Sequence, residues 1–161
     1  MRGSYEMRNV PDPLFPGSSR FGRIHRNDHV SIVAHCCAGS EVIADIRGHL
    51  MDSTQLVNFL VRSGLPVDVK RIHLVMCGAG AQNNSLPSFC QLLKDQLYRV
   101  GFRRDLEVVG NVHSMRMTDN GRPVALASNG ETMPASHGRV TESAPDFGLV
   151  STNRRRRRGR R

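Results

Sequence analysis

Short apolar runs, separated by stretches of mixed polarity, recur along this chain of 161 residues. Residues 30–34 (VSIVA) are apolar at four of five positions, which predicts a strand buried on both faces, as strands of a parallel sheet are. Residues 71–76 (RIHLVM) and 105–110 (DLEVVG) predict two further strands. We expect these runs to form the core sheet.

Two stretches between these strands have the amphipathic period of an α-helix. Residues 52–63 have one apolar face. Residues 86–100 carry an apolar stripe that only Gln96 interrupts, made of Phe89, Leu92, Leu93, Leu97 and Val100. Capping residues and helix-ending glycines support both boundaries. These flanking residues are Asp52 or Ser53, Gly64 and Pro66 for the first helix, and Ser85, Pro87 and Gly101 for the second.

Residues 113–126 (HSMRMTDNGRPVAL) predict a β-hairpin, with residues 119–121 (DNG) as its turn. The expected order is therefore strand, helix, strand, helix, strand and hairpin. Strands that alternate with amphipathic helices predict an α/β fold, in which a mostly parallel sheet with right-handed crossovers is flanked by helices.

The same pattern predicts the domain organisation. The length suits one compact domain, which we place at residues 23–127. Residues 1–22 contain prolines and turn residues with little periodicity, so they are expected to be irregular. Residues 128–153 are polar and punctuated by glycine and proline, which predicts a linker to an arginine-rich tail at residues 154–161.

The positive charge of the chain is concentrated in that tail. The chain has 23 basic and 14 acidic residues, a net charge of +9, and the last eight residues (RRRRRGRR) hold seven of the basic ones. Such a block stays solvated because its like charges repel one another. It suits a non-specific polyanion partner such as RNA, DNA, acidic lipid headgroups or a nuclear import receptor.

No apolar run approaches the length of a membrane-spanning helix, and the N-terminus has no apolar stretch of signal-peptide length. The four cysteines show no disulfide-framework spacing, so we expect free thiols and a reducing compartment. A zinc site drawn from neighbouring histidines and cysteines matches no structural zinc pattern, and no metal is expected. Its members would be His25, His29, His35, Cys36 and Cys37.

Two residues with catalytic chemistry directly follow predicted strands. His35 comes after the first strand and Cys77 comes after the second. Chemistry in an open parallel sheet occurs outside the carboxyl ends of its strands, and an imidazole beside a thiol forms a nucleophile with its own base. Gly78 leaves a backbone N–H open to an oxyanion. The simpler interpretation is a small buried cysteine and a hydrogen-bonded structural histidine.

The segment after Cys77 (CGAGAQN) does not complete other known loops. Asn83 stands where a dinucleotide-binding fingerprint has its third glycine and where a cysteine phosphatase loop has its arginine. These two functions are therefore disfavoured.

From His35 to Arg122 the chain resembles the caspase-like cysteine peptidase domains that autoprocess multifunctional RTX toxins and clostridial glucosylating toxins. Four segments carry this resemblance in order, with similar spacing: VSIVAH, IRGHLMDSTQLVNFL, IHLVMCG and LEVVGNVHSMRMTDNGRP. They resemble the strand that ends in the catalytic histidine, the loop and helix between histidine and cysteine, the strand that ends in the nucleophile, and the last strand with its flap hairpin.

The resemblance implies a caspase-like fold with a C-terminal hairpin flap, and a Cys-His dyad that cuts peptides after leucine. It makes Cys77 the nucleophile, His35 the base and Gly78 an oxyanion donor. It also implies activation by inositol hexakisphosphate, held in a basic pocket under the flap, which Arg122 contacts. Arginine side chains that would suit the same phosphates are Arg103, Arg104 and Arg116.

The chain departs from that family in three respects. Cys36 replaces the glycine that usually follows the histidine, 34 residues of this sequence precede His35, and we expect no attached cargo domain. We therefore expect a free-standing secreted bacterial effector that cleaves host proteins in the host cytosol. The alternative is a non-catalytic α/β module that binds nucleic acid or acidic membrane through its arginine tail.

Overall fold

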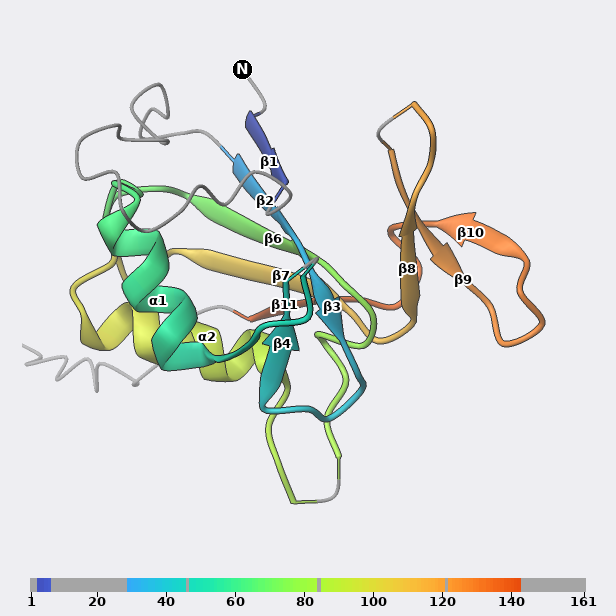
Figure 1. The fold of residues 1–161 in the computed structure, drawn as a ribbon, viewed down its shortest axis with the longest axis horizontal. Coiled ribbons are helices and arrows are strands. Elements are labelled where there is room, and N and C mark those ends of the chain that lie inside the picture. The colour runs from blue at the N-terminus through green and yellow to red at the C-terminus, as the bar shows by residue number, and fades with distance from the viewer. Residues whose placement is uncertain (1–2, 7–28, 46, 84, 121, 143–161) are drawn as a thin grey trace, which may run out of the picture.

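The computed structural model describes residues 3–6, 29–45, 47–83, 85–120 and 122–142 (Figure 1). Two helices and eleven strands form in these ranges. In chain order they are β1 (Gly3–Glu6), β2 (His29–Val33), β3 (His35–Cys36), β4 (Val42–Ala44), β5 (Leu50–Asp52), α1 (Ser53–Arg62), β6 (Arg71–Val75), α2 (Phe89–Arg99), β7 (Glu107–Asn111), β8 (Ser114–Met117), β9 (Pro123–Leu126), β10 (Thr132–Pro134) and β11 (Arg139–Glu142).

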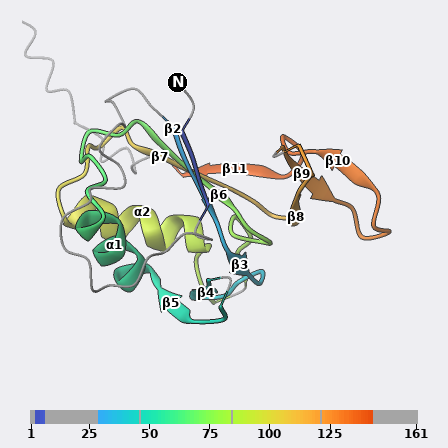
Figure 2. The same cartoon turned by 45° about the horizontal axis from the view of Figure 1, so that its top comes forward.

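The central sheet is mixed and has the strand order β1-β2-β6-β7-β11. The first four strands run parallel, whereas β11 is antiparallel to β7. Both helices lie on the same face of this sheet (Figure 2) and contact each other. This follows from the topology, because two successive crossovers of the same hand that advance in one direction place their helices on one side. The predicted α/β architecture with a mostly parallel sheet is confirmed.

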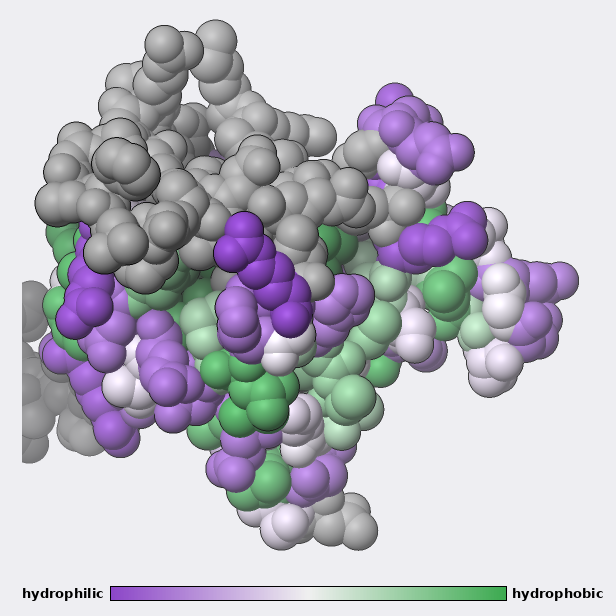
Figure 3. Space-filling view, viewed as in Figure 1, coloured by the Kyte–Doolittle hydropathy of each residue, from purple (hydrophilic) through white to green (hydrophobic). Residues whose placement is uncertain are grey.

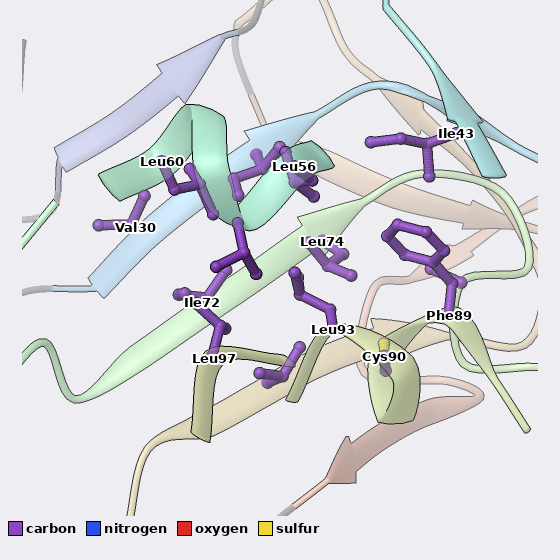
Figure 4. Packing of buried hydrophobic residues seen from close by; sticks show 14 of the residues in the cluster. Val30, Ile43, Leu56, Leu60, Ile72, Leu74, Phe89, Cys90, Leu93 and Leu97 are labelled. Atoms are coloured by element: carbon purple, nitrogen blue, oxygen red, sulfur yellow. The ribbon is translucent and has the colours of Figure 1, made fainter. Parts of the chain in front are cut away.

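The main hydrophobic core fills the space between the helices and the sheet (Figure 4). Most of its largest side chains are fully buried and come from α1, α2, β2 and β6, with Ile43 added from β4. The contribution of the helices explains why their amphipathic period is so clear in the sequence. Members that Figure 4 labels include Leu56, Leu60, Ile72, Leu74, Phe89, Leu93 and Leu97.

Strand β2 is not buried on both faces, contrary to the prediction from its apolar sequence. Val30 and Ile32 are fully buried against the helices, while Ser31 and Val33 on the other face are half-buried. In the described ranges the helices cover only one face of the sheet (Figure 2). Burial therefore alternates along the strand, as it does in a sheet with one covered face.

The ends of α1 agree with the predicted signals. Asp52 is the N-cap, and its side chain accepts a hydrogen bond from the Gln55 N–H while the Gln55 side chain accepts from the Asp52 N–H. Gly64 follows the helix with a φ of 82°, a conformation that glycine adopts without strain.

Helix α2 begins later than the sequence suggests. Its N-cap is Ser88, whose hydroxyl accepts a hydrogen bond from the Gln91 N–H. The predicted cap, Ser85, instead donates its backbone N–H to the side chain of Asn83. The N–H of Leu86 also donates to the Asn83 side chain, so Leu86 belongs to this turn, and residues 86–88 of the predicted helix precede α2.

One small sheet was not predicted, and a second is larger than predicted. Strands β3, β4 and β5 form a three-stranded antiparallel sheet between β2 and α1. The predicted hairpin forms as β8 and β9, with Asp119 and Asn120 in the turn, and β10 extends it to a three-stranded flap. Residues 128–153, predicted as a linker, thus contain β10 and also β11, which completes the central sheet.

The predicted N-terminal irregular segment contains β1, which pairs with β2. Residues 7–22 of that segment, residues 143–153 and the arginine tail lie outside the described residues.

Candidate functional site

His35 and Cys77 lie just beyond the carboxyl ends of two adjacent parallel strands. β2 and β6 pair in register, with Val33 opposite Val75, and each of the two candidate residues lies two positions further along. The chain runs from β2 through Ala34 directly into β3, so His35 leaves the central sheet at its end (Figure 1). The two predicted residues are thus brought to the same end of the sheet.

The thiol of Cys77 is held by a backbone segment of the flap. The N–H of Met115 donates to Sγ at 3.4 Å, and the thiol donates to the carbonyl of Met115 at 3.6 Å. Cys77 is half-buried, whereas His35 is exposed and has no hydrogen bond to its ring within the described ranges. In this structure the sulfur is therefore oriented by Met115, and not by the imidazole.

Gly78 does not present a free N–H, contrary to the role that the sequence suggests. Its N–H donates to the carbonyl of His113 at 3.0 Å. The glycine is required for another reason: its φ is 64°, and a Cβ at this position would lie 2.7 Å from the N and Cα atoms of Ala38. The loop that follows Cys77 thus touches the backbone of the loop that follows His35.

The other cysteines differ sharply from Cys77. Cys36 is buried, and the pKa of its thiol is raised to about 11, mainly by burial and to a smaller extent by the neighbouring Cys37 and by Cys77. Burial likewise raises the pKa of Cys90, beneath the sheet. Cys37 is exposed. At neutral pH the thiols accessible to a reagent are therefore those of Cys77 and Cys37.

The four candidate arginines do not form one group. Arg116 on β8 and Arg122 at the flap turn are both exposed, at one end of the molecule. Arg103 and Arg104 lie between α2 and β7, at the opposite end of the central sheet (Figure 1).

The side chains of Arg103 and Arg104 are also engaged in contacts with nearby residues. Arg103 forms an ion pair with Asp105 and donates to the carbonyl of Asp68 at 3.2 Å, while the guanidinium of Arg104 lies 5.8 Å from the centre of the Tyr98 ring. The expectation that Arg103 and Arg104 share a phosphate pocket with Arg122 is therefore wrong for this structure.

Asn111, at the end of β7, is a site residue that the sequence did not single out. Its side chain is buried, its Nδ2 donates to the carbonyls of Ala135 and His137, and its Oδ1 accepts the N–H of His113 at 2.8 Å. It fixes the segment that covers Gly78. The sequence feature that could have identified Asn111 is a polar amide side chain at the end of an apolar strand, directly before a hairpin.

The small sheet next to His35 presents apolar surface. Cross-strand register places His35 opposite Ala44, and Ala44 opposite Leu50, so the three lie in one row. Leu50 is 66% exposed and Val42 is 37% exposed. Hydrophobic side chains accordingly gather over β3 and β4 in Figure 3.

Within the described ranges, no group of three or more histidine, cysteine, aspartate or glutamate side chains is arranged to hold a metal ion. His25, a member of the zinc site considered above, lies outside these ranges. None of the helices described is long and apolar enough to cross a membrane. No protein-family model matches the chain, and no curated protein matches its sequence.

Proposed function

We propose that this protein is a cysteine peptidase of the caspase-like, toxin-processing type, with Cys77 as nucleophile and His35 as base. The observation that carries the proposal is the register of β2 and β6, which places both residues beyond the ends of adjacent parallel strands. Neighbouring strands lie about 4.8 Å apart, so the chain leaves β2 and β6 at adjacent positions, and in the proposed dyad the imidazole of His35 turns towards the thiol of Cys77.

The chemistry of such a dyad is acyl transfer. His35 removes the thiol proton, and the Cys77 sulfur attacks the scissile carbonyl to form a tetrahedral intermediate. Its collapse releases the amine, which takes the proton from His35, and leaves a thioester on Cys77. Water, deprotonated by His35, then hydrolyses the thioester and frees the thiol.

The described conformation is a resting state in this proposal. Met115 holds the Cys77 thiol, and His113 occupies the Gly78 N–H that would stabilise the oxyanion. Activity therefore requires the segment 113–115 to move away from Cys77 and Gly78. This segment continues directly into β8 of the flap.

An anionic activator suits this requirement. Arg116 and Arg122 are exposed on the flap and are the cations nearest in sequence to the covering segment. Inositol hexakisphosphate bound to these guanidinium groups would shift the flap and the covering segment together. The proposal thus includes activation by this ligand, in a secreted effector that cleaves proteins in the host cytosol.

The apolar row beside His35 supports a peptide substrate with an aliphatic side chain. Leu50 lies two strands from His35 on the same face of the small sheet, and most of its side chain is exposed. We expect Leu50→Asp to raise the concentration of a leucine-containing peptide needed for half-maximal rate, with little change in the maximal rate.

Covalent labelling tests the proposal. The purified protein is treated with a leucine-directed, thiol-reactive peptide with and without inositol hexakisphosphate, and the adduct is located by peptide mapping. We expect labelling at Cys77 that His35→Ala abolishes and that the ligand accelerates. Ligand-independent labelling at Cys77 would retain the peptidase and remove the activator. Labelling of Cys77 no faster than that of the buried Cys90 would refute the dyad.

A second function is favoured by the arginine tail, in which seven of the last eight residues are arginine. A non-catalytic module would bind RNA, DNA or acidic lipid through these residues. Such binding weakens steeply as salt rises and disappears when residues 154–161 are deleted. Peptidase activity, in contrast, should survive the deletion.

A further inference from the structure

The loop that follows His35 and the loop that follows Cys77 are in contact at two places. The first is the approach of Gly78 to the backbone of Ala38. The second lies further along both loops, where Gly39 faces the side chain of Asn83: a Cβ on Gly39 would lie 2.8 Å from Nδ2 of Asn83. Gly39 also has a φ of 71°, so a glycine is required there for conformation as well as for space.

Asn83 makes a different kind of contact with each loop. Its Oδ1 accepts hydrogen bonds from the N–H of Ser85 at 3.0 Å and the N–H of Leu86 at 2.7 Å, which stabilise a turn within its own loop. Its Nδ2 donates to the carbonyl of Gly39 at 3.1 Å, across to the loop that follows His35. One amide therefore joins the local turn to the facing loop.

From these contacts we propose that Asn83 is a positioning residue, which sets the spacing between His35 and Cys77 by holding the two loops together. The inference rests on the proposed dyad. Asn83 touches neither reacting atom and lies six residues after Cys77, while Gly39 lies four residues after His35. Because His35 is exposed and its ring is not held by a hydrogen bond in the described ranges, its placement depends on the backbone that carries it.

Substitutions of Asn83 separate the hydrogen bonds within its own turn from the hydrogen bond to Gly39. Asn83→Asp keeps an oxygen that accepts from Ser85 and Leu86, but it removes the donor to Gly39 and places a carboxylate oxygen against that carbonyl. Asn83→Ser removes the reach across the loops without adding charge. Gln82→Asp is the matched control, because it introduces the same charge at the preceding, exposed position.

The experiment measures alkylation of Cys77 by iodoacetamide across pH 5–9, with and without inositol hexakisphosphate and with the exposed Cys37 as internal reference. It is done in wild type, in each variant and in the same variants with His35→Ala. We expect Asn83→Asp and Asn83→Ser to slow the His35-dependent alkylation about 10- to 100-fold, since a misplacement of about 1 Å has effects of this size. In the His35→Ala background the same substitutions should change the rate less than about twofold. Gln82→Asp should match wild type.

The outcomes separate the two proposals. If alkylation of wild-type Cys77 does not depend on His35 either with or without inositol hexakisphosphate, the proposed dyad is wrong and the positioning function is wrong with it. If it depends on His35 but Asn83→Asp and Asn83→Ser react at the wild-type rate, only the inference on Asn83 is wrong. Equal slowing in both backgrounds, or equal changes at Cys37, would show a general structural effect and would also overturn it.

Discussion

The backbone of Met115 forms hydrogen bonds with the thiol of Cys77 through both its N–H and its carbonyl group, at 3.4 and 3.6 Å. The two residues are 38 positions apart in the chain, and the contact connects the end of a central strand to the flap. Together with the bond from the Gly78 N–H to His113, it covers the candidate nucleophile with one extended segment. Access to Cys77 is therefore a property of the flap.

Gly78→Ala should destabilise the protein by about 1–3 kcal/mol, because a side chain at a positive φ is strained and its Cβ would meet the backbone of Ala38. Gly101→Ala is the matched control: its φ is 97°, but a Cβ there would meet nothing within 4 Å. Urea unfolding of both variants measures the difference. Equal losses would show that the contact with Ala38 contributes nothing.

Asn111→Ala should lower the free energy of unfolding by about 1–3 kcal/mol, since it removes a buried side chain that donates to the carbonyls of Ala135 and His137. It should also accelerate alkylation of Cys77, because the His113 N–H is no longer held. Asn129→Ala removes a similar side chain from an exposed turn and serves as control. Unchanged stability would mean that Asn111 does not anchor the flap.

His73 should make the protein sensitive to mild acid. Burial, together with the smaller effects of the positive charges of Arg139 and Arg71, lowers the pKa of its imidazole to about 4. Arg71 itself is paired with Glu107. The ordinary value of 6.5 applies to the unfolded chain, so below that pH the unfolded state binds a proton that the folded state does not. The contribution of neutral His73 to the free energy of unfolding is therefore fully present above pH 6.5. It is lost as the pH falls towards 4, which lowers the free energy of unfolding by about 2–3 kcal/mol.

Urea titrations at several pH values check the contribution of His73. His73→Gln should flatten the dependence between pH 6.5 and 4, whereas His137→Gln, at an exposed position, should leave it in place. Identical slopes in wild type and His73→Gln would contradict the assignment.

Lys94→Met should lower the free energy of unfolding by about 1–3 kcal/mol, although the methionine side chain matches the aliphatic part of the lysine side chain. The Lys94 side chain is buried, its Nζ donates to the carbonyls of Arg104 and Leu106, and burial lowers the pKa of its ammonium. Thermal unfolding measures the loss. Lys70→Met, at an exposed position, should be nearly neutral, and a similar midpoint for both variants would refute a structural function of Lys94.

The burial of Lys94 is not predicted by the helical periodicity of the sequence. The apolar stripe of the second helix correctly included Phe89, Leu93 and Leu97, but it assigned no inner position to a lysine. A charged residue is normally expected on the solvent side, because an isolated buried charge is costly. Here two carbonyls from the loop before β7 compensate that cost, and this loop cannot be located from helical periodicity.

The sequence by itself determined the elements whose signals are local. The cap at Asp52, the two helical periods, the apolar strands and the Asp119–Asn120 turn each depend on neighbours within a few positions. Each of these elements formed, although α2 begins at Phe89 and β2 is covered on one face. The same local reasoning placed His35 and Cys77 at the ends of two strands.

Only the tertiary structure decided which groups meet across the chain. It paired β11 with β7, joined Met115 to Cys77, used the Gly78 N–H in a backbone hydrogen bond, and separated Arg103 and Arg104 from the flap. Hydrogen-bond partners that are tens of residues apart leave no periodic trace in the sequence, because any backbone group can satisfy any other. The sequence therefore predicted the candidate residues, but it did not predict the hydrogen bonds that cover Cys77 and Gly78.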